Sequence, residues 1–334
     1  MKTDYDIIHY LSKLKLVKFT AIYEAGPDGL DLPPFKGATF RGSFGHIFRE
    51  IACMCSHNEN GFASKHFDYC AYAYIFETTS PDGAEVLVNN ESIPRPFLLD
   101  PPNDMRTYYA PGERFTLGFT LFGKGIEYLP YFIYVLNAMG NQGFGKGQKQ
   151  ASLRQVFTVD KHGDLINSIY QAEDRLIRND FPPITGEDIL ASNINLDSLA
   201  QTCHIHFISP ARLKYGGEFV SAPEFHMVLR SAIRRITALL YFHHDEPKLG
   251  FDFQELFQRA ENEITCIESN VEWTSWERYS NRQKQRLKMG GIVGHAVYKG
   301  DFTPYVPWLQ LAEWSNIGKN PVFGLGRVKI IFSK

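Results

Sequence analysis

Residues 316–328 read Asn-Ile-Gly-Lys-Asn-Pro-Val-Phe-Gly-Leu-Gly-Arg-Val, and this stretch decides how the rest of the chain is interpreted. A short amphipathic segment precedes it and a β-rich run follows, so it predicts a glycine-rich turn between a helix and a final strand. Glycines allow backbone N–H groups to approach an anion where a Cβ atom would collide. Lys319 and Arg327 add positive charge. The turn therefore indicates a site for a phosphodiester backbone.

A second glycine-rich turn occurs in the middle of the chain, where residues 143–147 read Gly-Phe-Gly-Lys-Gly. The periodic segments before each turn follow the same order. In the first half, the pattern predicts strands at 16–23, 71–78, 114–122 and 152–159, a helix N-capped by Thr39, and a helix at 129–139. In the second half, it predicts strands at 203–208, 291–298 and 328–332 and helices at 224–241 and 306–314. We therefore expect an α+β protein built from two tandem ferredoxin-like (βαββαβ) domains with a C-terminal glycine-rich loop.

Charge is distributed unevenly between the expected domains. The length of 334 residues is typical of two domains, which we place at 1–160 and 201–334 with an acidic connector at 161–200. The chain has a net charge of −2, but residues 270–334 contain 10 Lys and Arg against 4 Asp and Glu, whereas residues 160–200 contain 3 against 8. Local charge steers a polyanion more than the total does, so the C-terminal domain is the better candidate for binding one.

The cysteines do not suggest a disulfide framework, because there are five of them, an odd number, in a long chain. The N-terminus has no apolar signal-like segment, so we expect a cytoplasmic protein without a membrane partner. Cys53, Cys55, His57, His66 and Cys70 are close in sequence. Their spacing does not match the usual two-residue zinc knuckle. We expect no metal and no cofactor, although zinc binding by the three cysteines stays open.

Three segments resemble a known family, the RAMP (repeat-associated mysterious protein) superfamily of CRISPR systems. They are Phe-Arg-Gly-Ser-Phe-Gly at 40–45, Arg-Tyr-Ser-Asn-Arg-Gln at 278–283 before the glycines of 290–294, and Ile-Gly-Lys at 317–319 before Phe-Gly-Leu-Gly at 323–326. Within that superfamily they are most similar to the bacterial branch of the endoribonucleases that process CRISPR precursor RNA. The resemblance spans most of the chain.

The resemblance implies an endoribonuclease that cuts CRISPR repeat RNA without a metal. In such a reaction the ribose 2′-hydroxyl attacks the adjacent phosphate and leaves a 5′-hydroxyl and a 2′,3′-cyclic phosphate. The reaction needs a base for the 2′-hydroxyl, an acid for the leaving oxygen and positive charge at the phosphate. The implied partners are the repeat RNA and other CRISPR effector subunits.

His46 is the first candidate for the general base or acid, because it lies in the matching motif near the start of a predicted helix and points away from the apolar stripe. Arg49 is its i+3 neighbour, and the resemblance suggests Tyr23 as a partner acid. His226 has the equivalent place in the second half and is the alternative. An ordinary strand-end aromatic explains Tyr23 better than the role of partner acid does, and a half-buried pair on one strand explains His204 and His206 better than contact with RNA.

The candidate RNA-binding residues are cations, amides and one aromatic in the C-terminal quarter, a combination suited to phosphates and bases. These are Arg278, Tyr279, Arg282, Lys284, Arg286, Lys288, Gly318, Lys319, Gly324, Gly326 and Arg327.

Two other interpretations remain open from the sequence. One is a non-catalytic RAMP subunit that binds CRISPR RNA within an effector complex. It is favoured by Asn316, because many similar proteins have a histidine one residue before Ile-Gly-Lys. The other is an acylphosphatase-like or small-ligand enzyme on the same fold, for which the sequence offers no specific residue pattern. Fold alone does not separate these functions.

Overall fold

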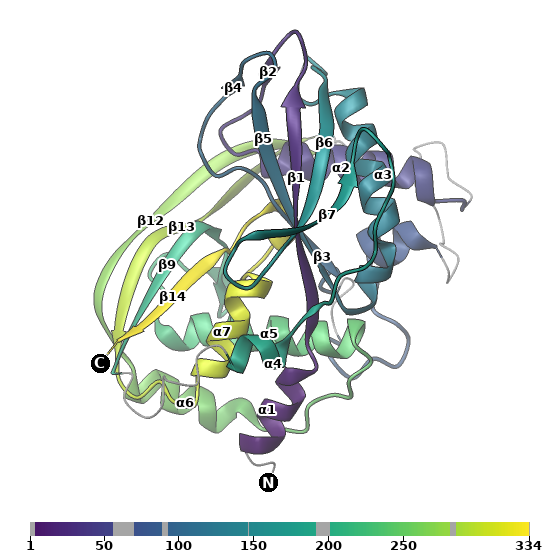
Figure 1. The fold of residues 1–334 in the computed structure, drawn as a ribbon. Helices are drawn as coiled ribbons and strands as arrows, with labels where there is room; N and C mark the ends of the chain where they lie inside the picture. Colours follow the sequence, from purple (N-terminus) through teal and green to yellow (C-terminus); the bar gives the residue numbers. More distant parts are fainter. Residues whose placement is uncertain are drawn as a thin grey trace. The chain divides into compact units, whose positions relative to one another are not determined.

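The computed structural model describes residues 4–55, 70–88, 93–145, 147–191, 201–280 and 285–333. The chain divides into two compact units (Figure 1). Unit 1 comprises Met1–Leu14, Thr185–Tyr241 and Asp245–Lys334, and unit 2 comprises Lys15–Ile184 and Phe242–His244. None of the helices in the described ranges is long and apolar enough to span a bilayer.

Unit 2 contains an antiparallel sheet with the strand order β3-β5-β1-β6-β7. Its strands are β1 (Lys15–Ala25), β3 (Phe97–Asp100), β5 (Arg114–Phe122), β6 (Ala151–Val159) and β7 (Leu165–Gln171). Buried and more exposed residues alternate along much of β1, as expected for a strand with only one face in a core. Phe19 of β1 lies opposite Phe119 of β5 in the register, and their rings stack with centroids 4.7 Å apart.

Two helices, α2 (Gly37–Ala52) and α3 (Leu129–Gln142), pack against each other and bury aromatic side chains against this sheet. The ring of Phe44 on α2 lies 5.5 Å from that of Phe97 on β3 and 4.8 Å from that of Phe132 on α3. Burial of such rings contributes most of the apolar area that stabilises the unit. The opposite side of α2 is left exposed and carries His46.

Unit 1 repeats the arrangement with the strand order β12-β13-β9-β14. The strands are β9 (Thr202–Ala211), β12 (Thr265–Ser280), β13 (Gln285–Lys299) and β14 (Val328–Ser333), and the two main helices are α5 (Phe225–His243) and α7 (Val306–Ser315). Phe225 of α5 packs between Tyr298 and Tyr305, with ring centroids 5.6 and 5.2 Å away. In each unit the first strand lies between the third and the fourth, which confirms the prediction of two ferredoxin-like domains.

The remaining elements are short or peripheral to these two sheets. They are α1 (Asp4–Ser12), β2 (Leu30–Asp31), the π-helical turn η1 (Ala73–Glu77), β4 (Tyr108–Tyr109), η2 (Gly123–Tyr128), β8 (Ile184–Thr185), α4 (Gly186–Ala191), β10 (Lys214–Tyr215), β11 (Glu218–Phe219), α6 (Phe253–Glu263) and η4 (Pro321–Phe323).

Several local predictions were wrong. Residues 71–78, where a strand was expected, form a helical segment that contains η1. The second strand of the βαββαβ order in unit 2 is β3 instead. The long strand β12 was not predicted. The helix expected to be N-capped by Thr39 has its N-cap three residues earlier, at Lys36, whose side chain makes no capping hydrogen bond. The segment expected to be a connector, 161–200, contains β7 of unit 2 and α4 of unit 1, and residues 192–200 lie outside the described ranges.

Candidate nucleic-acid interface and catalytic residues

The glycine loop, residues 316–328, is held in shape by its own backbone. Asn316, Gly318, Gly324 and Gly326 all have φ between 58° and 78°. The N–H of Gly318 donates to Ser231 Oγ (2.7 Å), that of Gly324 to the carbonyl of Pro321 (2.8 Å) and that of Gly326 to the carbonyl of Pro210 (3.1 Å). Because these N–H groups already have protein acceptors, the loop does not offer them to an anion. Our expectation for the role of the glycines is corrected on this point.

Gly326 is the position in the loop where a side chain would collide most severely. A Cβ atom would lie 1.8 Å from the carbonyl oxygen of Ile317, and φ is +76°. We therefore expect Gly326→Ala to lower the free energy of unfolding by about 2–4 kcal/mol, from left-handed strain plus overpacking. Gly217→Ala is the matched control, since Gly217 has φ +93° but nothing within 4 Å of the added atom. The control is expected to lose only about 1–2 kcal/mol in urea unfolding. Equal losses would contradict the collision.

Five basic side chains surround the glycine loop, and we call them the cation cluster. They are Arg212, Lys214, Arg234, Arg278 and Lys319. The carbonyl of Arg212 accepts from the N–H of Lys319 (2.9 Å). The guanidinium of Arg278 lies 5.0 Å from the ring centroid of Phe323 in the loop. Sequence reasoning found Lys319 and Arg278 but missed Arg212 and Lys214. The available signal was the Arg-Leu-Lys run at 212–214, where a predicted strand ends.

Three members of the cluster, Arg212, Arg278 and Lys319, hold positive charge in a partly buried setting. Partial burial, followed by the nearby charges of Arg234 and Lys214, lowers the pKa of Lys319. Burial and then Arg278 lower the pKa of Arg212, and burial alone lowers that of Arg278. Among the described residues, no carboxylate pairs with Arg212, Arg278 or Lys319. Cations gathered in this way repel one another, and a bound polyanion would relieve that repulsion.

Part of the predicted basic segment lies in β12 and β13, which pair as an antiparallel hairpin. Arg278 pairs with Leu287 in the register and Tyr279 with Arg286. Arg286 Nη1 lies 3.5 Å from Glu277 Oε2, so this cation is partly neutralised. Lys288 is exposed. Arg282 and Lys284 lie outside the described residues, as does the side chain of Tyr279.

Arg327 sits at the end of the glycine loop. Its N–H donates to Ser209 Oγ (2.9 Å), and its side chain is half-buried. The position is compatible with the predicted RNA contact, which stays a prediction.

His46 is an exposed residue on α2 of unit 2. Its Nε2 lies 3.2 Å from Glu50 Oε1, one helical turn further on, and the side chain is 57% exposed. A carboxylate in this position can hold the imidazole in one orientation. Arg49 is half-buried on the same helix, and its charge acts on the nearby Tyr72 hydroxyl. His46 is thus accessible to a ligand, as its predicted role requires.

Tyr23 does not fit its predicted role as partner acid. It is fully buried in the core of unit 2, stacks on Phe115, and its hydroxyl donates to the carbonyl of Leu136 (2.7 Å). Burial raises the pKa of the hydroxyl far above its ordinary value. A proton donor in this position has no route to a substrate, so the strand-end aromatic is a core residue.

The alternative histidine, His226, is buried, and both of its ring nitrogens already contact neighbouring polar side chains. It is only 2% exposed, its Nε2 lies 3.1 Å from Glu224 Oε2, and Arg230 Nε donates to its Nδ1 (3.4 Å). His204 and His206 are half-buried on β9, where the ring of His206 stacks on His295 at 5.5 Å. Of the histidines considered, His46 is therefore the one best placed for chemistry.

Asn316 occupies the position where the family resemblance suggested a histidine. Its side chain is 4% exposed, and its Nδ2 donates to the carbonyl of Leu325 (3.0 Å) across the loop. This amide closes the glycine loop and is not directed to a ligand. The structure thus gives Asn316 an architectural role.

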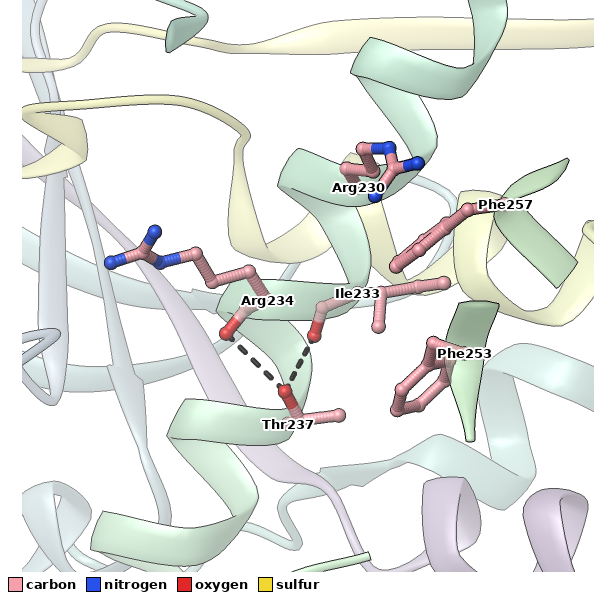
Figure 2. A pocket seen from close by; sticks show the side chains of 6 residues that line it. All are labelled: Arg230, Ile233, Arg234, Thr237, Phe253 and Phe257. Atoms are coloured by element: carbon pink, nitrogen blue, oxygen red, sulfur yellow. Dashed lines mark hydrogen bonds between the residues drawn. The ribbon is translucent and has the colours of Figure 1, made fainter. Parts of the chain in front are cut away.

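A pocket of about 300 Å³ lies between α5 and α6 (Figure 2). The guanidinium of Arg230 lies 4.1 Å from the ring centroid of Phe257, and Phe253 stacks on Phe257 at 5.8 Å. Figure 2 shows the guanidinium of Arg234 extending away from both rings. Arg230 Nη2 also lies 3.9 Å from Glu261 Oε2, so the cation of this pocket already has an acidic partner. Arg234 both lines this pocket and belongs to the cation cluster, so the two adjoin along α5.

The fold and the charge define a class: a tandem ferredoxin-like protein with a basic glycine loop in its C-terminal unit. Residues 14–181 match the family of N-terminal domains named AF_1859_N, and residues 205–328 match the family described as CRISPR-associated endoribonuclease Cas6. Residues 14–181, half of the chain, therefore belong with the AF_1859_N domains, and the C-terminal unit is similar to the Cas6 family of CRISPR-associated endoribonucleases.

Among curated proteins, an uncharacterized protein of Archaeoglobus fulgidus is 31% identical over 119 residues, which are 35% of this chain. The match spans 38% of the length of that relative. Because this relative is archaeal, the expected bacterial branch stays a prediction.

Solved structures show the same fold at low identity. Thermus thermophilus Cas6 has a TM-score of 0.53 and 12% identity, with 95% of this chain and 99% of that chain covered. A Cas6 product complex has a TM-score of 0.54 and 13% identity, covering 94% of this chain and 100% of the other. A chain of a partial Cas6-RT-Cas1–Cas2 complex has a TM-score of 0.56 and 11% identity, covering 96% and 46%.

Proposed function

We propose that this protein binds CRISPR repeat RNA and cuts it once per repeat, without a metal in the reaction. The ribose 2′-hydroxyl attacks the adjacent phosphate, the 5′-oxygen leaves with a proton, and the products carry a 2′,3′-cyclic phosphate and a 5′-hydroxyl. The cation cluster around the glycine loop carries this proposal. It lies within the region that matches the Cas6 family, and in the described part of the chain its members Arg212, Arg278 and Lys319 pair with no carboxylate.

The residues divide into two roles. Lys319, Arg212 and Arg278 hold phosphates of the RNA, because they are cations close to one loop; Lys319 is exposed, and the two arginines are half-buried. His46 moves a proton during the cut, because it is an accessible imidazole oriented by Glu50. Arg49 and the exposed Lys288 remain supporting candidates for charge near the RNA.

A non-catalytic subunit that binds CRISPR RNA is the second candidate. Two observations favour it: Asn316, at the position where the resemblance suggested a histidine, serves the loop, and Tyr23 is buried away from any substrate. A similar chain occurs in a Cas6-RT-Cas1–Cas2 complex, so association with other CRISPR proteins also belongs to this proposal. Binding without cutting would select this candidate.

Cleavage in the presence of EDTA tests the chemistry. We expect a labelled repeat RNA from the same genome to be cut in EDTA, and the same RNA with one 2′-deoxy nucleotide at the cut site to be bound with equal affinity but left intact. Without the 2′-hydroxyl there is no nucleophile, so the loss should be complete within detection. Mass spectrometry of the products should show the cyclic phosphate. Cutting of the 2′-deoxy RNA would contradict the mechanism.

A further inference from the structure

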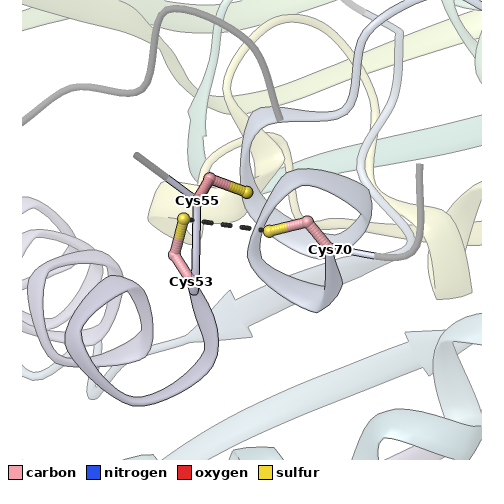
Figure 3. A group of neighbouring side chains, drawn as sticks. All are labelled: Cys53, Cys55 and Cys70. Atoms are coloured by element: carbon pink, nitrogen blue, oxygen red, sulfur yellow. Dashed lines mark hydrogen bonds between the residues drawn. The ribbon is translucent and has the colours of Figure 1, made fainter. Parts of the chain in front are cut away.

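Three cysteine side chains converge in unit 2, on the side of α2 where that helix ends (Figure 3). Cys53 is the residue directly after α2, Cys55 follows two positions later, and Cys70 precedes the helical turn that contains η1. The three sulfur atoms lie within 4.8 Å of one another, and Cys70 Sγ is 3.8 Å from Cys53 Sγ. Cys55 and Cys70 are each only 5% exposed.

The distance between Cys53 Sγ and Cys70 Sγ is that of two sulfurs on a tetrahedral metal ion. A Zn–S bond of about 2.3 Å at tetrahedral angles places two sulfurs about 3.8 Å apart. The backbone N–H of Cys55 hydrogen-bonds to the thiol of Cys53, and that of Ala73 hydrogen-bonds to the thiol of Cys70. Burial has the larger effect and raises the pKa of the two thiols, whereas these hydrogen bonds lower it, so a metal must displace the protons of the thiols on binding. Thiols themselves are weak hydrogen-bond donors and gain little from facing one another.

We propose that Cys53, Cys55 and Cys70 bind one zinc ion through three thiolates, with the fourth position taken by water or another donor. Zinc suits a set of thiolates without redox chemistry. Binding converts three thiols to thiolates and releases three protons for each Zn²⁺ taken up, so affinity rises with pH. The ion joins the end of α2 to the turn before η1. Its role is structural, because Cys55 and Cys70 are buried, Cys53 is half-buried and no step of RNA cleavage uses them.

A disulfide is the competing explanation for the two nearest sulfurs. It would bring Cys53 and Cys70 to about 2.05 Å and leave Cys55 as an unused third thiol. The convergence of three sulfurs, rather than two, favours the metal. The two explanations differ in a directly measurable way, because a disulfide loses two hydrogens and holds no metal.

The test uses the full chain purified without chelators and without a metal-affinity tag. We expect about one zinc per chain by elemental analysis, and Co²⁺ exchanged into the protein should give the strong visible absorption and sulfur-to-metal charge transfer of a tetrahedral thiolate site. Cys55→Ser should weaken zinc binding roughly 100-fold. Cys266→Ser, which removes an exposed cysteine of unit 1, is the matched control and should retain the full metal content.

Several outcomes would overturn the inference. They are an absence of zinc together with no thiolate–Co²⁺ absorption, copper or iron in place of zinc, unchanged zinc in Cys55→Ser, or a Cys53–Cys70 disulfide in the mass spectrum of the unreduced protein. If Cys55→Ser does not fold, the Co²⁺ spectrum of the unsubstituted protein still decides. The inference is independent of the proposed nuclease activity. Measuring zinc after the EDTA incubation separates loss of the ion from failure of the cleavage chemistry.

Discussion

His46→Ala is expected to slow cleavage of repeat RNA by about 10²–10⁴-fold under single-turnover conditions, the range for losing a proton-transfer group. The side chain is exposed on α2, and its contact with Glu50 is a surface pair. A pair of this kind contributes at most about 1 kcal/mol to stability. The variant should therefore fold normally and bind RNA with unchanged affinity, so that the loss appears in the rate of the cut.

Two further variants sharpen this experiment. His162→Ala removes another exposed histidine of unit 2 and should cut at the parental rate. Glu50→Gln keeps a hydrogen-bonding side chain but removes the charge beside the imidazole, and we expect a smaller loss of about 3–30-fold. A His46→Ala protein that cuts as fast as the His162→Ala control would eliminate His46 as the proton-transfer group. It would leave the nuclease assignment standing.

The strands and helices predicted correctly are those whose apolar periodicity faces a core. β1, β5 and α5 belong to this group, because their buried residues recur at the period of the element. β12 was missed since most of its side chains are exposed, which leaves no apolar alternation to detect. Residues 71–78 are rich in aromatic and β-branched types, which favour strands. Packing of Phe76 against Phe44 on α2 accompanies a helical conformation there, so tertiary contacts override local preference.

Tertiary contacts limit the prediction of the candidate site from sequence even more than they limit the prediction of the fold. Sequence identified Lys319 and Arg278 as cations near a glycine turn, but the contribution of Arg212 depends on the path of the chain beyond β9. Burial separates Tyr23 from His46, although both are polar residues at plausible positions. Similarly, the linear spacing of Cys53, Cys55 and Cys70 matches no familiar motif, yet the fold brings their sulfurs together. Side-chain burial and long-range proximity are consequences of packing that one-dimensional patterns do not encode.

Removing two members of the cation cluster, in the variant Lys319→Met with Arg278→Met, is expected to weaken RNA binding about 10- to 100-fold at 0.1 M salt. If each cation neutralises one phosphate, the slope of log affinity against log salt should decrease in magnitude by about 1.4–2. Binding should weaken for all RNA sequences alike, because phosphates carry no base identity. Lys329→Met is the matched control, since Lys329 lies on β14 of the same unit and is paired with Glu313 at 3.3 Å. An unchanged salt slope in the double variant would show that these cations do not contact phosphates.

The pH dependence of the protein's stability provides an independent check on the role of Lys319 in the cation cluster. The pKa of Lys319 is lower in the folded protein than in the unfolded chain, so the unfolded chain binds more protons between those two pKa values. Stability therefore rises with pH across that interval, and below it the charged lysine destabilises the fold. Lys319→Met should be at least as stable as the parent near neutral pH, and its stability should rise less steeply at alkaline pH. Together with weaker RNA binding, this result would mean that Lys319 strengthens RNA binding and lowers the stability of the free protein. A clear loss of stability would instead make Lys319 a structural residue, and the weaker binding would then follow from a distorted loop.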